Sequence, residues 1–315
     1  MLKENDIRQM ADACGIAMVG LTTPEPFTQW LNVLKTRQET GRMTDFERTK
    51  PEKRIRYDGC LDNVKAVIVI GLPYASKAAW PEERQKRCSL ASVAWGEDYH
   101  NLVMAKLNQL ADCLKSCCPG IKTRGYVDNS RLLDRAAAHR AGLGFFGKNN
   151  TLIHPEYGSR FFIGQLLIDR AVEFEAAEPM TSRCGGCKKC LEACPGDALE
   201  EGFTLKPEQC ISYITQKKTL TPEEEALLTE SIYGCDICQN VCPWNRGREI
   251  EYTGEIEKVF PKLDDMIRMT DEDFEQIFAK TAAGWRGKKI LKRNAEIIKK
   301  NRKKHVNSSK KCYNE

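Results

Sequence analysis

Eight cysteines in the second half of the chain constrain its fold more than any other feature of the sequence. Four of them fall within the eleven residues 184–194 and read C-x2-C-x2-C-x3-C-P, and C-x2-C-x3-C-P follows at 235–243. In bacterial ferredoxins, a run of the first kind gives three thiolates to one 4Fe-4S cluster and its fourth thiolate to another cluster. The second run lacks one cysteine, which the isolated Cys210 can supply. The pattern therefore predicts a segment that folds around two clusters.

The ferredoxin pattern divides the eight cysteines into two sets of four. The assignment is crossed: Cys194 of the first run belongs to the set of the second run, and Cys242 of the second run belongs to the set of the first run. We name these sets the first and the second cluster site: Cys184, Cys187, Cys190 and Cys242 in the first, and Cys194, Cys210, Cys235 and Cys238 in the second. Zinc ribbons also contain C-x2-C pairs, but they pair two short knuckles and do not need the longer run. We therefore interpret the segment as an iron-sulfur electron-transfer module.

Composition and the N-terminal sequence favour a cytoplasmic location. Of the 315 residues, 41% are apolar and 30% are charged, and no apolar stretch is long enough for a membrane helix. Glu4 and Asp6 stand where a secretory signal peptide would be basic. Disulfides rarely persist in the reducing cytoplasm, which favours metal binding or redox chemistry for clustered cysteines. We expect a cytoplasmic monomer without a membrane partner.

Outside the cysteine-rich segment, helical and strand patterns alternate along the chain. Apolar residues at helical spacing cover residues 7–14 and 103–114, while "AVIVIGLPY" and "RFFIGQLLI" have the composition of buried strands. Thr221 and Glu224 form a capping box with a proline between them, which predicts a helix before the second cysteine run. We expect an α+β protein in three parts: an α/β-type domain at 1–175, a ferredoxin-like domain with two 4Fe-4S clusters at 176–250, and a short basic helical segment at 251–315.

Positive charge is concentrated near the C-terminus. Residues 286–311 contain twelve Lys or Arg and one acid, Glu296, which gives +11, while the whole chain carries +5 and the remainder therefore −6. Nucleic acid is the obvious polyanion for such a segment, and its binding would weaken steeply with salt. A solvated basic terminus would have the same composition. Composition alone leaves both interpretations open.

Residues 125–167 are rich in glycine, asparagine and aromatic residues, the mix expected where the backbone closely approaches a ligand. A carboxyl group next to a large apolar cofactor has a raised pKa and can donate a proton. Asp128 follows a strand-like "YV" and precedes a turn-like "NS", so it occupies a strand-end position suited to this role. Asp134, in "LLDRAAAHR", is expected to be a salt-bridge partner on a helix surface.

Several stretches together resemble one known family. They are "WGEDYH", "YVDNSRLLDRAAAHRAGLGFFGKN", "QCISYITQ" between the two cysteine runs, and "GWRGKKILKRNAEI". In this combination and order the chain resembles the epoxyqueuosine reductases, over roughly residues 5 to 298. The resemblance implies a cobalamin-binding domain related to that of reductive dehalogenases, a ferredoxin domain with two 4Fe-4S clusters, and tRNA as substrate. Many members continue into C-terminal helical repeats that this sequence does not contain, so a smaller tRNA footprint is expected.

The resemblance also implies roles for individual residues. Asp128 matches the proton donor of the family, and Asp98-Tyr99-His100 nearly meets the corrinoid motif D-x-H-x-x-G, although Val103 stands where that spacing places glycine, so no histidine is expected to bind cobalt. The expected cobalamin contacts are Arg54, Asp128, Leu152, Ile163, Ser212 and Asp236. The residues expected to face tRNA are Trp285, Arg286, Lys288, Lys289 and Arg293.

The function implied by the resemblance is reduction of the epoxide of epoxyqueuosine, at the wobble position in the anticodon loop of tRNA, to queuosine. Electrons would come from an external flavodoxin- or ferredoxin-type reductant and pass through the two clusters to cobalamin, and the protein would supply orientation, a dry pocket and a proton. Two other functions remain open. One is a different corrinoid and iron-sulfur reductase, similar to a dehalogenase, that acts on a small molecule. The other is a ferredoxin-type electron carrier without catalytic activity.

Overall fold

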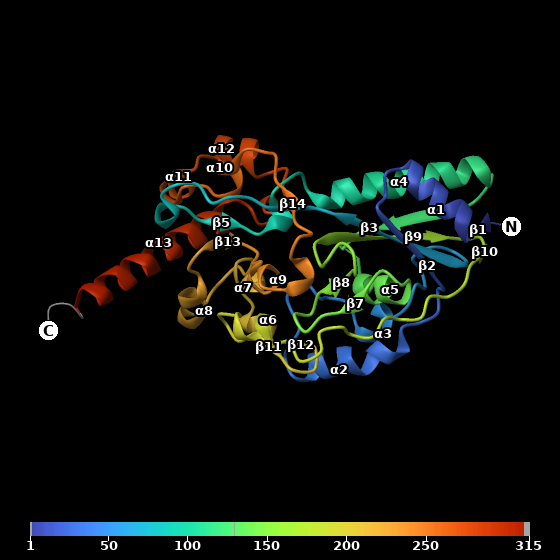
Figure 1. Cartoon of the computed structure of the whole chain (residues 1–315), viewed down its shortest axis with the longest axis horizontal. Coiled ribbons are helices and arrows are strands. Elements are labelled where there is room, and N and C mark those ends of the chain that lie inside the picture. The colour runs from blue at the N-terminus through green and yellow to red at the C-terminus, as the bar shows by residue number, and fades with distance from the viewer. Residues whose placement is uncertain (1, 129, 312–315) are drawn as a thin grey trace.

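The computed structural model describes residues 2–128 and 130–311 of the chain. The N-terminal sheet and the helices that cover it form one end of an elongated molecule, the cysteine-rich segment lies in the middle, and the long C-terminal helix projects from the other end (Figure 1). Among the described residues, no helix has the length and apolar character needed to cross a membrane.

A four-stranded antiparallel sheet organises the N-terminal end. Its strands are β2 (Met18–Thr22), β3 (Ala66–Pro73), β9 (Phe161–Ile168) and β6 (Thr123–Tyr126), in the order β2-β3-β9-β6. The first five residues of β3 are completely buried because both faces of the sheet are covered. This explains why the strand is a continuous apolar run without the polar alternation of a half-exposed strand. The two strands that the sequence predicted in these runs are confirmed.

One face of the sheet is covered by α1 (Glu4–Ala13) and α4 (Tyr99–Cys117). The predicted stripe on α4 is confirmed, because Val103, Leu107, Leu110 and Leu114 have no exposed surface. Gly164 of β9 permits this close packing, since a Cβ atom there would lie 2.5 Å from Val103 Cγ1. A short parallel pair, β1 (Leu2–Lys3) with β10 (Val172–Glu173), lies beside the sheet.

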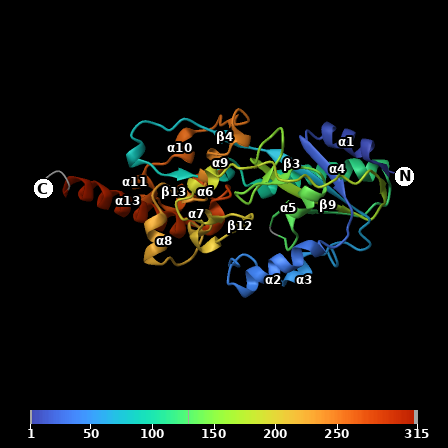
Figure 2. The same ribbon diagram turned by 60° about the horizontal axis from the view of Figure 1, so that its bottom comes forward.

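The other face is covered by a short helix and a hairpin. Helix α5 (Asp134–Arg140) ends before Gly142, which has a φ of +76° and so takes the left-handed conformation common after helices. The hairpin pairs β7 (Phe145–Phe146) with β8 (Leu152–Ile153). Helices α2 (Leu31–Glu39) and α3 (Pro51–Arg54) lie outside this layer, and the connection between them reaches the cysteine-rich segment, where Arg42 pairs with Glu200 at 2.8 Å (Figure 2).

The cysteine-rich segment contains only short elements. Its helices are α6 (Lys189–Glu192), α7 (Ile211–Ile214), α8 (Pro222–Leu227) and α9 (Ile237–Asn240), and β11 (Leu199–Glu200) pairs with β12 (Thr204–Leu205). The capping box predicted before α8 is confirmed, because Glu224 N donates to Thr221 Oγ1 at 3.3 Å and Thr221 N donates to Glu224 Oε2 at 3.0 Å. Loops rather than regular structure therefore carry most of the cysteines.

Residues 75–95 leave the N-terminal end and pair with strands from the second half of the chain. Strand β4 (Ala75–Lys77) pairs with β14 (Ile250–Glu251), and β5 (Ser89–Leu90) pairs with β13 (Ser231–Tyr233), both in parallel. Their buried residues share one hydrophobic core with the C-terminal helices α10 (Ile256–Val259), α11 (Leu263–Arg268), α12 (Asp271–Ile277) and α13 (Lys288–Lys311). These parallel pairings tie together the two halves of the chain.

Helix α13 contains most of the basic residues and also contributes to this core. Leu291, Ala295 and Ile298 are fully buried on one side of it. Buried Asn294 donates to the carbonyl oxygens of Thr215 and Ile232, and Asn301 donates to those of Glu225 and Leu228. The part of the basic segment that forms the start of α13 is therefore packed into the fold.

Candidate functional site

The first cluster site is a cavity lined by thiols. Four cysteines from the two runs surround a space of about 40 Å³: Cys184, Cys187, Cys190 and Cys242. Phe145 and Ile153 from the β7–β8 hairpin pack against Cys242, and Trp244 covers Phe145 edge to face with ring centroids 5.1 Å apart. The structure thus brings together the four cysteines that the sequence assigned to this site, under an apolar cover.

The second cluster site collects the other four cysteines: Cys194, Cys210, Cys235 and Cys238. Burial raises the pKa of Cys238 well above its ordinary value, and the nearby Cys235 and Cys210 add to the effect. Burial likewise raises the pKa of Cys235 to about 12, where Cys210 and Cys194 also contribute. Adjacent thiols of this kind can bind a metal or an iron-sulfur cluster as thiolates, because a bound metal stabilises the deprotonated sulfur.

Backbone N–H groups interact with sulfur atoms of the second site. Ala198 N donates to Cys194 Sγ at 3.3 Å, and the N–H groups of Tyr213 and Ser212 oppose the rise in the pKa of Cys210 that burial causes. Such N–H donors to sulfur are also what tunes the reduction potential of iron-sulfur clusters. Within the described residues, no three His, Cys, Asp or Glu side chains are arranged to hold a single metal ion. The donor set of two times four thiols fits two 4Fe-4S clusters.

Asp128 lies where the sequence predicted, just beyond the end of β6, and its backbone has a φ of +37° in the left-handed region. Its side chain is 64% exposed. The Tyr99 hydroxyl donates to Asp128 Oδ2, and His100 Nε2 lies 3.8 Å from the same oxygen. Both partners come from the first turn of α4, which Asp98 caps by accepting from His100 N at 3.0 Å. The packing of α4 against the sheet therefore sets the environment of Asp128.

Tyr99 is held as a hydrogen-bond donor to Asp128. Its ring stacks on Phe162 with centroids 4.6 Å apart and an interplanar angle of 9°. Burial raises the pKa of Tyr99 far above its ordinary value, and the charge of Asp128 adds to this, so the hydroxyl keeps its proton. The sequence did not predict this contact, although "WGEDYH" was already notable as a near match to a corrinoid motif.

The prediction that Asp134 is a surface salt-bridge partner is wrong. Asp134 begins α5 on the side of the sheet, where Asp134 Oδ1 accepts from Gln165 Nε2 at 2.5 Å. Gln165 is fully buried and its Oε1 accepts from the Tyr57 hydroxyl at 2.8 Å. Burial raises the pKa of Asp134 to about 7, with a further contribution from the charge of Asp128. The spacing of apolar residues along the helix did not indicate that Asp134 faces the sheet, because Asp134 is the first residue of α5.

The residues expected to contact cobalamin lie in separate places. Arg54 of α3 and Arg37 of α2 both pair with Glu47, while Leu152 of β8 and Ile163 of β9 belong to the core layer near α5. Ser212 is the second residue of α7, beside Cys210, and Asp236 immediately precedes α9.

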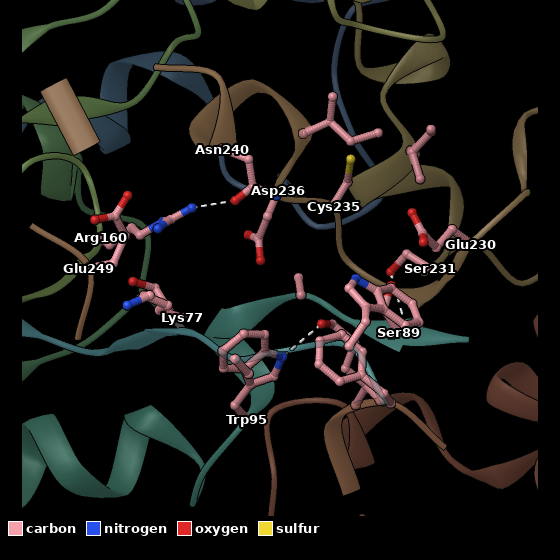
Figure 3. A pocket seen from close by; sticks show the side chains of 18 of the residues that line it. Lys77, Ser89, Trp95, Arg160, Glu230, Ser231, Cys235, Asp236, Asn240 and Glu249 are labelled. Carbon is pink, nitrogen blue, oxygen red and sulfur yellow. Dashed lines mark hydrogen bonds between the residues drawn. The ribbon is translucent and has the colours of Figure 1, made fainter. Parts of the chain in front are cut away.

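Asp236 lines a cavity of about 530 Å³ between residues 76–95 and the cysteine-rich segment. It points into this space (Figure 3), and its Oδ2 accepts from Ser92 N at 2.6 Å. Arg160 donates to Asn240 at the cavity wall. Three buried polar atoms on or beside the cavity have no hydrogen-bond partner in the part of the chain that the structure describes: Ser76 Oγ, Ser92 Oγ and Arg160 Nε. The cavity therefore suits a polar portion of a ligand.

The residues expected to face tRNA differ in their environments. Trp285 is 54% exposed, Arg286 lies over its ring at 4.1 Å, and Lys289 is exposed. Lys288 pairs with Asp271 at 2.5 Å. Arg293 donates to the carbonyl oxygens of Lys217 and Lys218, at 2.7 and 2.9 Å, and so also holds the cysteine-rich segment to α13.

Comparisons with known proteins agree with this arrangement. Residues 54–129 match the family described as "Epoxyqueuosine reductase QueG, DUF1730", and residues 183–245 match the "4Fe-4S double cluster binding domain". The chain is 35% identical to epoxyqueuosine reductase of Bacillus subtilis over 302 residues, which covers 93% of this chain and 78% of that protein.

Two solved structures have the same fold. The structure of epoxyqueuosine reductase from Streptococcus thermophilus is 36% identical, with a TM-score of 0.89 over 95% of this chain and 81% of that one. A crystal structure of epoxyqueuosine reductase with an epoxyqueuosine-modified tRNA-Tyr stem loop is 34% identical, with a TM-score of 0.90 over the same shares of the two chains.

Proposed function

The chain belongs to the epoxyqueuosine reductase family, and on this premise we propose that it reduces the epoxide of epoxyqueuosine in tRNA to the alkene of queuosine. The reaction takes up two electrons and two protons, breaks both carbon–oxygen bonds of the epoxide and releases water. The observation that carries the proposal is the position of Asp128, an exposed carboxyl held by Tyr99, on the same chain as two complete sets of four thiols.

Asp128 is the proposed proton donor to the epoxide oxygen. Tyr99 fixes Oδ2 of this carboxyl and keeps its own proton, so it orients the acid without competing for the proton. The exposed remainder of the side chain can reach a substrate. General acids of this kind contribute about 100- to 10,000-fold to a rate.

Cobalamin supplies, when bound, a cobalt centre that can reach a low-valent, strongly reducing state. The residues proposed to hold it are Arg54, Asp128, Leu152, Ile163, Ser212 and Asp236. The unpaired polar atoms of Ser76, Ser92 and Arg160 near Asp236 support the presence of a polar ligand in this region. The proposed contacts rest on the family resemblance together with this cavity.

The two cluster sites are proposed to pass single electrons from an external flavodoxin- or ferredoxin-type donor. Their closeness supports a relay, because Cys190 of the first site lies on α6, Cys238 of the second lies on α9, and these two helices contact each other. The basic start of α13, with Trp285, Arg286 and Lys289, is proposed to face the anticodon loop of tRNA. The cytoplasmic location, the monomeric state and the division at residues 175 and 250 remain predictions.

Nucleoside mass analysis tests the proposed function. The protein is reconstituted anaerobically with iron, sulfide and cobalamin, supplied with a reductant and incubated with tRNA that contains epoxyqueuosine. We expect conversion to queuosine, which is lighter by one oxygen atom. Asp128→Asn should lower turnover about 100-fold or more while the cluster and corrinoid absorption bands persist.

The matched control is Asp112→Asn, which changes a 74% exposed aspartate on the outer side of α4. Its turnover should equal that of the unmodified protein. The absence of conversion by the unmodified protein contradicts the proposed function, and full turnover by Asp128→Asn contradicts the role of Asp128 alone. A dehalogenase-like reductase would instead act on small molecules and show no salt-sensitive binding to tRNA.

A further inference from the structure

Two exposed aromatic side chains from distant parts of the chain meet on the surface. Phe46, in the connection between α2 and α3, is 43% exposed, and Trp285, just before α13, is 54% exposed. Their ring centroids lie 5.4 Å apart at an interplanar angle of 70°. Single exposed apolar side chains are common, but a pair that stays this exposed after mutual contact suggests a binding surface.

Both residues are held in place by neighbouring side chains: Trp285 by hydrogen bonds, and Phe46 by an aromatic contact. Trp285 Nε1 donates to Gln216 Oε1 at 3.2 Å and to the Tyr233 hydroxyl at 3.1 Å. Tyr213 packs edge to face against Phe46 at 5.3 Å, and the Tyr213 hydroxyl accepts from Asp45 N at 3.1 Å. With these contacts in place, Phe46 and Trp285 remain 43% and 54% exposed, so the pair is preorganised.

Positive charge accompanies the two rings. The Arg286 guanidinium lies 4.1 Å from the Trp285 ring centroid and 5.0 Å from that of Phe46. Arg286 Nε is buried and has no hydrogen-bond partner among the described residues, although the charge of Asp45 acts on the guanidinium. Lys289, three residues after Arg286, is exposed. The surface therefore combines aromatic faces with cationic groups, which suits a nucleic acid base with its phosphate.

This surface adjoins the Asp128 site through two tyrosine side chains. Tyr233 accepts the hydrogen bond from Trp285 and belongs to a buried core against which Tyr99 packs. Tyr99 in turn donates to Asp128, so Trp285 and Asp128 are linked through Tyr233 and Tyr99. A strand that places one nucleotide at Asp128 would bring an adjacent nucleotide to Trp285 and Phe46.

We propose that Phe46, Trp285 and Arg286 form a stacking platform for an unpaired RNA base next to the nucleotide that enters the Asp128 site. The proposal rests on the proposed function and deepens it. A nucleotide that leaves its stack exposes the face of its neighbour, and an aromatic platform replaces the lost stacking without reading the base identity. Phe46 is the new member, since it comes from the N-terminal half of the chain and no sequence motif indicated it.

Binding of an unmodified anticodon stem loop tests the platform apart from catalysis. Phe46→Ala should weaken Kd about 5- to 100-fold, the range expected for loss of one stacked base. Phe46→Tyr should restore the affinity, whereas Phe46→Leu, which is apolar but has no aromatic ring, should not. The matched control is Phe203→Ala, at a phenylalanine that is 39% exposed before β12, and it should leave Kd unchanged.

Salt dependence and cross-linking separate stacking from charge. Phe46→Ala should leave the slope of log Kd against log salt unchanged, whereas Lys289→Ala should reduce it by about one. A stem loop with 5-iodouridine beside the wobble position should cross-link under light to the peptide that contains Phe46 or to the one that contains Trp285.

Unchanged binding and turnover in Phe46→Ala would overturn the platform while the proposed function stands. Equal weakening of binding to a fully paired RNA stem would overturn it too, because a paired base cannot stack on the rings. Failure of the unmodified holoenzyme to reduce epoxyqueuosine would instead remove the proposed function, and the stem-loop binding data would still report on the platform.

Discussion

The N-terminal sheet and the cysteine-rich segment are stabilised in different ways. In the sheet, β3 and β9 are covered on both faces, and Val67, Ile68 and Leu167 have no exposed surface. In the cysteine-rich segment, the four helices have only four to six residues each. Each of the two cluster sites consists of four thiols. The sheet can hold its shape through apolar burial alone, whereas the cluster sites depend on metal-ligand bonds.

The largest expected effect comes from removing single cluster ligands. Cys190→Ser should remove the cluster of the first site and Cys194→Ser that of the second, because the crossed assignment places these neighbours in different sets. Each variant should retain about half of the iron and sulfide and lose turnover. Iron and sulfide analysis, with paramagnetic resonance of the reduced protein, should show a different remaining signal in each.

Cys113→Ser is the control for these variants. Cys113 lies on α4 with its Sγ 3.9 Å from that of Cys14, outside both cluster sites, so its replacement should change neither iron content nor turnover. Identical remaining signals in Cys190→Ser and Cys194→Ser would contradict the crossed assignment. Bound zinc without sulfide would contradict the clusters altogether.

An intermediate effect is expected in the sheet. Leu167→Ala removes a fully buried side chain from β9 and should lower the free energy of unfolding by about 2–5 kcal/mol. At low temperature the folded protein should keep its full iron and sulfide content, because Leu167 belongs to a hydrophobic cluster that contains none of the eight cysteines of the two cluster sites. Thermal unfolding measures the loss.

Val33→Ala is the control for the sheet variant, since Val33 on α2 is 45% exposed, and it should change the free energy of unfolding by less than about 0.5 kcal/mol. If Leu167→Ala lost iron in proportion to its loss of stability, the two regions would form one cooperative unit. The contrast between burial and metal ligation would then be wrong.

The sequence predicted local structure well in both regions for a physical reason. Continuous apolar runs and cysteine spacing are local patterns; they revealed β3 and β9, and they predicted the two ligand sets. The pairing of β5 with β13 joins residues about 140 positions apart, and no periodicity in either strand encodes its partner. The contact of Tyr99 with Asp128 depends on how α4 packs on the sheet, so it too became visible only in the folded chain.

The smallest expected effect concerns Asp134, a carboxyl group at the start of α5 that accepts from the buried Gln165 of the sheet. Because burial raises its pKa to about 7, the folded protein holds a proton there that the unfolded chain, with a pKa near 3.9, releases earlier. The contribution of Asp134 to stability is therefore full at low pH and is lost as pH rises through about 7.

Asp134→Asn removes this titration and keeps an oxygen that can accept from Gln165. The variant should unfold at nearly the same temperature as the unmodified protein at about pH 4 and at a higher temperature at pH 8, with the difference rising between the unfolded and the folded pKa of Asp134 and levelling above about pH 7. Thermal unfolding at several pH values measures this difference. A difference that does not change with pH would show that Asp134 is already ionised in the folded protein, so that the sheet layer tolerates a buried charge beside Asp128.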